Sequence, residues 1–158
     1  MTTPNNGFYR IMESTKKSVE KKKLRIVFDA AAEFKVESLN SSMLTGQKLQ
    51  KELPEILIKF REKPIARGAD IEAMFSRIRL SQDDARYHRY LMPDPTTGKV
   101  EVFQMNRLSF GDAASPFVAM STLHRTADDY GKGHKRACRA IRDNFYMDDL
   151  LDSLKKLP

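Results

Sequence analysis

Two adjacent aspartates near the end of the chain have side chains that suggest chemistry. Asp148 and Asp149 stand in the sequence FYMDDLL, between apolar residues that predict a hairpin. Two carboxylates at a tight turn repel each other unless a cation neutralises them. Mg²⁺ prefers such hard oxygen ligands and usually takes one or two carboxylates together with phosphate and water oxygens. The pair therefore predicts a divalent-metal site, although a bare Asp-Asp pair is more often an ordinary surface turn.

A third carboxylate is expected to complete such a site, and Asp70 is the best candidate. It ends the strand-like segment ARGAD and begins DIEAMF, where a turn of the chain can aim it at the hairpin. Taken alone, Asp70 is better explained as the N-cap of a helix. The combination of the three aspartates favours the metal site.

The composition excludes several other classes of site. Cys138 is the only cysteine and the three histidines have no partners at ligand spacing, which excludes disulfide scaffolds and cysteine-rich zinc sites. The 28 lysines and arginines exceed the 21 aspartates and glutamates, and the net charge of +7 favours an anionic partner such as nucleic acid. The sequence lacks a membrane-spanning run and a signal peptide, so we expect an intracellular protein with no membrane partner.

Periodicity predicts the elements that must position these residues. Residues 1–23 are polar and lysine-rich, and we expect them to form a flexible basic lead-in to one compact domain at 24–158. Strands are expected at 24–28 and 66–71, hairpins at 87–105 and 145–151, helices between Leu49 and Pro64 and between Gly111 and Gly131, and short helical turns after Ser81 and at 137–142.

The order of several motifs resembles a known family. The chain contains, in sequence, LRIVFDA, SLN, ADIEAMF, LSFGDAASPF and FYMDDLL. This ordered set resembles the reverse transcriptases of LTR retrotransposons, most closely the Pao/BEL group, from about Leu24 to Asp152. The resemblance implies an α+β fold, with an antiparallel palm sheet that bears the carboxylates, helices on one face of that sheet and a fingers hairpin.

The resemblance also implies the activity of an RNA-directed DNA polymerase. Asp70 and Asp148 would hold two Mg²⁺ ions, with Mn²⁺ as the alternative, the main-chain carbonyl of Ile71 would assist, and Asp149 would be an auxiliary carboxylate. The partners would be a primed RNA or DNA template, deoxynucleoside triphosphates and the remainder of the polymerase polyprotein. The expected location is the cytoplasm, in retrotransposon particles.

Four residues would bind the incoming nucleotide if the resemblance holds. Arg25 matches the fingers arginine that grips the triphosphate, and its companion lysine would be Lys21, Lys22 or Lys23, a run that a solvated tail explains equally well. Phe75 matches the aromatic residue that lies beneath the sugar and selects deoxynucleotides. Without the resemblance, Phe75 is better interpreted as an ordinary core phenylalanine. Phe110 and Gly111 belong to the motif that lies against the nucleotide, where retroviral relatives have glutamine in place of Phe110.

Template and primer contacts are expected from Arg77, Arg79, Tyr146 and Met147. A solvated charged face explains the two arginines equally well. Because the sequence ends at Pro158, we expect an incomplete frame without a thumb. The alternative function is that of a non-catalytic, nucleic-acid-binding remnant of a retroelement.

Overall fold

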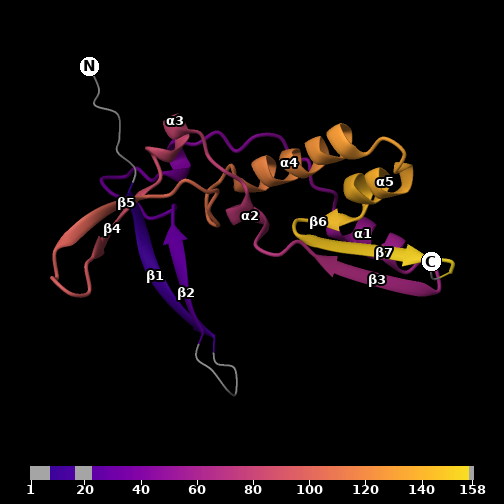
Figure 1. Ribbon diagram of the computed structural model, residues 1–158, viewed down its shortest axis with the longest axis horizontal. Coiled ribbons are helices and arrows are strands. Elements are labelled where there is room, and N and C mark those ends of the chain that lie inside the picture. The colour runs from indigo at the N-terminus through magenta and orange to yellow at the C-terminus, as the bar shows by residue number, and fades with distance from the viewer. Residues whose placement is uncertain (1–7, 17–22, 157–158) are drawn as a thin grey trace. The chain divides into compact units, whose positions relative to one another are not determined.

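The chain forms many short helices and strands. The computed structural model describes residues 8–16 and 23–156, and within them the fold is mixed α+β (Figure 1). The strands are β1 (Phe8–Lys16), β2 (Lys23–Asp29), β3 (Ile65–Asp70), β4 (Arg89–Pro93), β5 (Val100–Gln104), β6 (Phe145–Tyr146) and β7 (Asp149–Leu154). The helices are α1 (Leu53–Phe60), α2 (Met74–Arg77), α3 (Gln82–Ala85), α4 (Ser115–Tyr130), α5 (Lys135–Asp143) and the 3-10 helix η1 (Asn40–Ser42). None of the helices in this described part is long and apolar enough to cross a bilayer.

The chain divides into two compact units, each assembled from two separated stretches of sequence. The first unit holds the residues up to Thr45 together with Phe75–Ser115. The second unit holds Gly46–Met74 together with the residues from Pro116 onward. The sequence predicts one compact domain. Its composition does not reveal a linker between the two units, because the chain leaves each unit and later returns to complete it.

The first unit is built on a four-stranded sheet in the order β2-β1-β4-β5. The pairs β1–β2 and β4–β5 are antiparallel, whereas β1 and β4 are parallel. The ring of Tyr90 lies between two other aromatic rings, with centroids 5.1 Å from that of Phe28 and 5.5 Å from that of Phe103. These ring contacts join β2 to the β4–β5 hairpin.

The strand β1 lies where the sequence predicts a flexible lead-in. It pairs with β2 from Arg10, opposite Asp29, to Lys16, opposite Lys23. The nearby lysines dominate the composition of this stretch and obscure its strand-forming aromatic and β-branched residues. The rest of the lead-in, residues 1–7 and 17–22, lies outside the described residues, and Lys21 and Lys22 lie there with it.

The second unit is built on a three-stranded antiparallel sheet in the order β3-β7-β6, shown in Figure 1. The helices α1 and α5 both contact β6 and β7. Ile56 of α1 is fully buried, and α4 buries Ala119, Met120 and Ala127 along one stripe. Apolar stripes on these helices therefore supply much of the core of this unit.

Local sequence signals account for several element boundaries. The helix α1 begins at Leu53 and takes Pro54 in its first turn, where a missing N–H costs nothing. Ser81 caps α3 and accepts the backbone N–H of Asp84 at 3.1 Å. The carboxylate of Asp94 accepts two backbone N–H groups in the β4–β5 turn, which lowers its pKa. The predicted helix, capped turn and hairpin are therefore confirmed.

Candidate active site

The β6–β7 hairpin carries two of the three candidate aspartates. Tyr146 pairs with Asp149, so that Met147 and Asp148 form the turn between the strands. Met147 has a φ of 57°, and a bulky side chain is strained in this left-handed region. Strain of this kind persists only where the surrounding structure enforces it, and it is concentrated at functional sites. The backbone of this turn is therefore a first indication of function.

The end of β3 brings the third aspartate beside this turn. In the antiparallel register of β3 and β7, Asp70 is the direct partner of Asp149. The N–H of Ile71 donates to the carbonyl oxygen of Asp148 at 2.9 Å, which ties the turn to the end of β3. Directly opposed side chains of antiparallel strands share one face of the sheet. The register therefore places the carboxylates of Asp70 and Asp149 on the same face, at the same end of the sheet.

No cation of the described residues neutralises these carboxylates. Asp70 and Asp149 are exposed and Asp148 is half-buried. Within residues 8–16 and 23–156 their side chains form no hydrogen bond or ion pair. By contrast, Asp152 of the same strand β7 accepts from a guanidinium at 2.9 Å and from an amide at 2.8 Å. The charge at the turn is therefore available to a cation from outside the chain.

The donor atoms suit a hard divalent cation held by a pair of carboxylates. Across the described part of the chain, no group of three or more His, Cys, Asp or Glu side chains gathers as a ready metal cage. Mg²⁺ does not require one, because phosphate and water oxygens complete its octahedron around one or two carboxylates. Asp70 with Asp148 or Asp149 provides that number. The carbonyl oxygen of Ile71 accepts the N–H of Met74 at 3.1 Å and retains a second lone pair for a ligand.

The aromatic pair predicted to contact the nucleotide lies in the first unit. Phe75 is only 4% exposed, and its ring centroid lies 4.2 Å from that of Phe110, which is 64% exposed. Phe75 therefore packs as a core residue against Phe110, and the ring that can stack on a base or sugar is that of Phe110. Contact of Phe75 with a sugar stays a prediction.

The loop 108–115 is held in place by hydrogen bonds over short and long sequence separations. The side-chain amide of Asn40 donates to the carbonyl oxygen of Gly111 at 2.9 Å and accepts the N–H of Ala113 at 2.8 Å. Within the loop, the buried hydroxyl of Ser115 donates to the carbonyl oxygen of Ser109 at 2.6 Å. These hydrogen bonds hold the backbone of the predicted nucleotide motif in place.

Gly111 occupies a position in this loop that demands glycine. Its φ is +98°, and an added Cβ would lie 2.8 Å from the carbonyl oxygen of Phe28. The absence of a Cβ at Gly111 therefore permits a close approach to the backbone at the end of β2. An approach of Gly111 to a nucleotide stays a prediction.

The other predicted contacts are placed as follows. Arg25 lies in β2 opposite Ser14, and its side chain falls outside the described part of the structure. Arg77 ends α2, and both Arg77 and Arg79 are exposed. Tyr146 is half-buried in β6. Their contacts with a template or primer stay predictions.

Sequence reasoning missed the polar residues that support the loop 108–115. Asn40 bonds to residues 71 and 73 positions away. His88 and Asp112 are both buried, with Nδ1 and Oδ2 3.6 Å apart. The one available signal was their position, because Asn40 stands in the SLN motif and Asp112 in LSFGDAASPF.

The candidate residues belong to two sets. The three aspartates and Ile71 belong to the second unit, whereas Arg25, Phe75, Phe110 and Gly111 belong to the first.

No model of a known protein family matches the chain, and no curated protein is significantly similar to it.

Proposed function

We propose that this chain is the fingers and palm region of an RNA-directed DNA polymerase, a reverse transcriptase of the Pao/BEL retrotransposon type. The observation that supports this most is the opposition of Asp70 and Asp149 across β3 and β7, beside the strained turn that holds Asp148. A pair of carboxylates at one end of the sheet, with no counter-charge among the described residues, suits nucleotidyl transfer by divalent ions whose other ligands are phosphate and water oxygens. The order of the sequence motifs around these carboxylates is the reason for proposing the Pao/BEL family.

The chain's own contribution to the reaction would be positioning. Asp70 and Asp148 would hold Mg²⁺ together with the carbonyl oxygen of Ile71, and Asp149 would be the auxiliary carboxylate. When bound, Mg²⁺ lowers the pKa of the primer 3′-hydroxyl and neutralises the triphosphate and the departing pyrophosphate. The paired strands keep Asp70 and Asp149 on one face, and the hydrogen bond from Ile71 keeps Asp148 at the strand end.

The first unit would supply the contacts to nucleotide and template. Arg25 is proposed to bind the triphosphate, since a guanidinium pairs with phosphate through two parallel hydrogen bonds. The exposed ring of Phe110, supported by Phe75, would stack against the incoming deoxynucleotide. Arg77 and Arg79 would contact the template backbone through sequence-independent ionic interactions.

Primer extension on a primed RNA template with Mg²⁺ tests this proposal. Asp70→Asn and Asp148→Asn are expected to slow extension by more than about 100-fold, because even residues that only support a metal ligand contribute about 10- to 100-fold. Asp83→Asn is the matched control, because Asp83 is an aspartate of the first unit whose side chain is 89% exposed. Extension that is unchanged in both site variants would contradict the proposal.

Binding of Mn²⁺, followed through the relaxation of water protons, gives a readout that needs no activity. The unmodified chain and Asp83→Asn are expected to bind the ion with the same affinity. Asp70→Asn and Asp148→Asn are expected to bind it more weakly, because each loses a charged oxygen ligand. Equal affinity in all four proteins would place the ion elsewhere.

A second candidate function is nucleic-acid binding without catalysis. The net charge of +7 and the exposed Arg77 and Arg79 favour it. Salt-sensitive binding of the primed template, with no extension in either Mg²⁺ or Mn²⁺, would support this function and count against the polymerase.

A further inference from the structure

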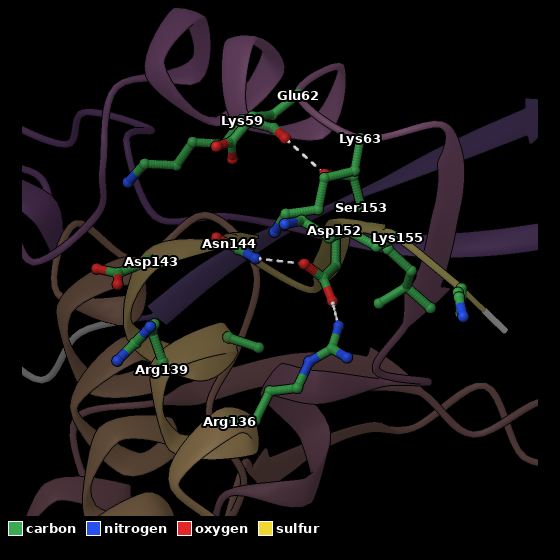
Figure 2. Close-up of a pocket in the computed structure, with 13 residues that line it drawn as sticks. Lys59, Glu62, Lys63, Arg136, Arg139, Asp143, Asn144, Asp152, Ser153 and Lys155 are labelled. Atoms are coloured by element: carbon green, nitrogen blue, oxygen red, sulfur yellow. Dashed lines mark hydrogen bonds and ion pairs between the residues drawn. The ribbon is translucent and has the colours of Figure 1, made fainter. Parts of the chain in front are cut away.

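A cavity of about 620 Å³ lies in the second unit, towards the end of β7 that is remote from the aspartate turn. Residues of α1 and α5 and of the end of β7 line it (Figure 2), and Asp70, Asp148 and Asp149 do not. A strand advances about 3.4 Å per residue, so Ser153 lies roughly 14 Å along β7 from Asp149. The cavity is therefore a separate site, which we call the basic pocket.

Cations predominate in the lining of the basic pocket. They come from three segments: Lys59 and Lys63 from α1 and the residues after it, Arg136 and Arg139 from α5, and Lys155 and Lys156 from the residues after β7. Three carboxylates also line the basic pocket, namely those of Glu62, Asp143 and Asp152. The balance of charge is positive.

Two of the six cations are already paired. Figure 2 shows Arg136 and Asn144 directed at the two oxygens of Asp152, at 2.9 and 2.8 Å. The Asp152 side chain is only 13% exposed, so this ion pair is partly shielded from water. The ammonium group of Lys59 donates to Glu55 at 2.8 Å, and this hydrogen bond raises the pKa of Lys59. These pairs leave Arg136 and Lys59 less available to a ligand.

Four cations of the basic pocket are left for a ligand. Their side chains form no hydrogen bond or ion pair with any residue in the described part of the chain: Lys63, Arg139, Lys155 and Lys156. Only the carboxylates of Glu62 and Asp143 remain to oppose them. A concave surface with an excess of one charge concentrates ligands of the opposite charge.

The lining also indicates which kind of anion would bind. No aromatic ring lines the basic pocket among the described residues, and Ala140 and Leu154 are its only apolar side chains. Bases and nucleosides bind mainly by stacking on aromatic rings, and none is present here. Lysine and arginine contact phosphate groups without regard to sequence. The volume lies within the range of about 300–1,000 Å³ that is usual for ligand sites and is larger than one phosphate needs.

We infer that the basic pocket binds the sugar-phosphate backbone of a nucleic-acid strand through Lys63, Arg139, Lys155 and Lys156. This inference goes beyond the proposed nucleotidyl transfer and does not depend on it, because the contact requires neither a metal nor a reaction. Ionic contacts at a distance from the aspartates would lengthen the time for which a strand stays bound.

Fluorescence anisotropy with a labelled oligothymidylate, measured in EDTA, tests this inference. The double variant Lys63→Gln, Arg139→Gln is expected to bind on the order of tenfold more weakly at about 0.1 M salt. The slope of log affinity against log salt should fall by about 1.4, since each contact with a single strand contributes about 0.7. The matched control is Lys99→Gln, Lys132→Gln, which removes two exposed lysines outside the basic pocket and should leave the slope unchanged.

Equal losses in the two double variants would overturn the inference. Because the binding is measured in EDTA, where Mg²⁺-dependent extension cannot occur, a failure of this binding and a failure of primer extension are separate results. Inorganic phosphate and thymidine monophosphate serve as competitors at equal phosphate concentration. A competitor that displaces the labelled oligonucleotide as effectively as unlabelled oligothymidylate would show that the basic pocket binds small phosphate compounds. That result would overturn the inference of a bound strand.

Cross-linking gives a second measurement on the unmodified chain, which no folding defect can affect. An oligonucleotide that contains 4-thiothymidine is irradiated with the protein, and the linked peptides are identified by mass spectrometry. Links are expected in 59–63, 136–144 or 152–156, the segments that line the basic pocket. Links confined to other segments would overturn the inference.

Discussion

The β6–β7 turn and the loop 108–115 both carry motif residues, but they differ in how their polar groups are bonded. The polar groups of the loop form hydrogen bonds within the chain, whereas the carboxylates at the turn form none with the described residues. At the turn, Asp70 and Asp149 face each other on the surface with no cation of the described residues beside them. In the loop, Asn40 satisfies two backbone groups, and the hydroxyl of the buried Ser115 donates to the carbonyl oxygen of Ser109. Buried, satisfied groups specify shape, whereas exposed, uncompensated charges favour a ligand. Folding therefore accounts for much of the loop motif, whereas the carboxylates at the turn remain available to a ligand.

The largest effect on stability is expected from Gly111→Ala in the loop. The positive φ alone should lower the free energy of unfolding by about 1–3 kcal/mol, and the approach to the carbonyl oxygen of Phe28 should add to this loss. Urea denaturation measures the change. Gly98→Ala is the matched control, because Gly98 also has a positive φ, +67°, but nothing lies within 4 Å of its added Cβ. Equal losses would mean that the close approach does not constrain the loop.

A loss of about 1–3 kcal/mol in the free energy of unfolding is expected from Asn40→Ala, because the half-buried N–H of Ala113 loses its acceptor. Thermal unfolding followed by circular dichroism measures it. Asn106→Ala is the control, because Asn106 is exposed and its side chain forms no hydrogen bond in the described part of the chain. If the two variants are equally stable, the loop does not depend on Asn40.

The smallest effect, and one of opposite sign, is expected at the turn. In EDTA, Asp149→Asn should raise the free energy of unfolding by about 0.2–1 kcal/mol, because it removes a like charge directly opposite Asp70. Added Mg²⁺ should stabilise the unmodified chain more than this variant, since ligand binding stabilises only the form that binds it. Denaturation with and without Mg²⁺ measures both effects.

Asp152→Asn provides the contrast on the same strand. Both oxygens of Asp152 have partners, so its replacement should lower the free energy of unfolding. A loss of stability for Asp149→Asn in EDTA would mean that its carboxylate is already compensated, and the distinction between turn and loop would fail.

Local signals in the sequence predict many of the elements but not how they combine. The cap at Ser81 and the proline at the start of α1 act over a few residues, and both are confirmed. The strand β1 and the single turn α2 were not predicted. The pairing of β1 with β4 joins Phe8 to Arg89, and a contact at that separation leaves no local pattern. For the same reason the composition predicts one domain where the structure has two units.

Backbone preferences over a few residues suffice to predict that Asp148 and Asp149 lie at a hairpin turn and that Asp70 ends a strand. The strand register, which pairs Asp149 with Asp70, is seen only in the folded chain. The same is true of the pocket that is lined by cations from α1, α5 and the residues after β7. Strand register and the convergence of distant segments depend on which apolar faces are buried together, and no local preference specifies them.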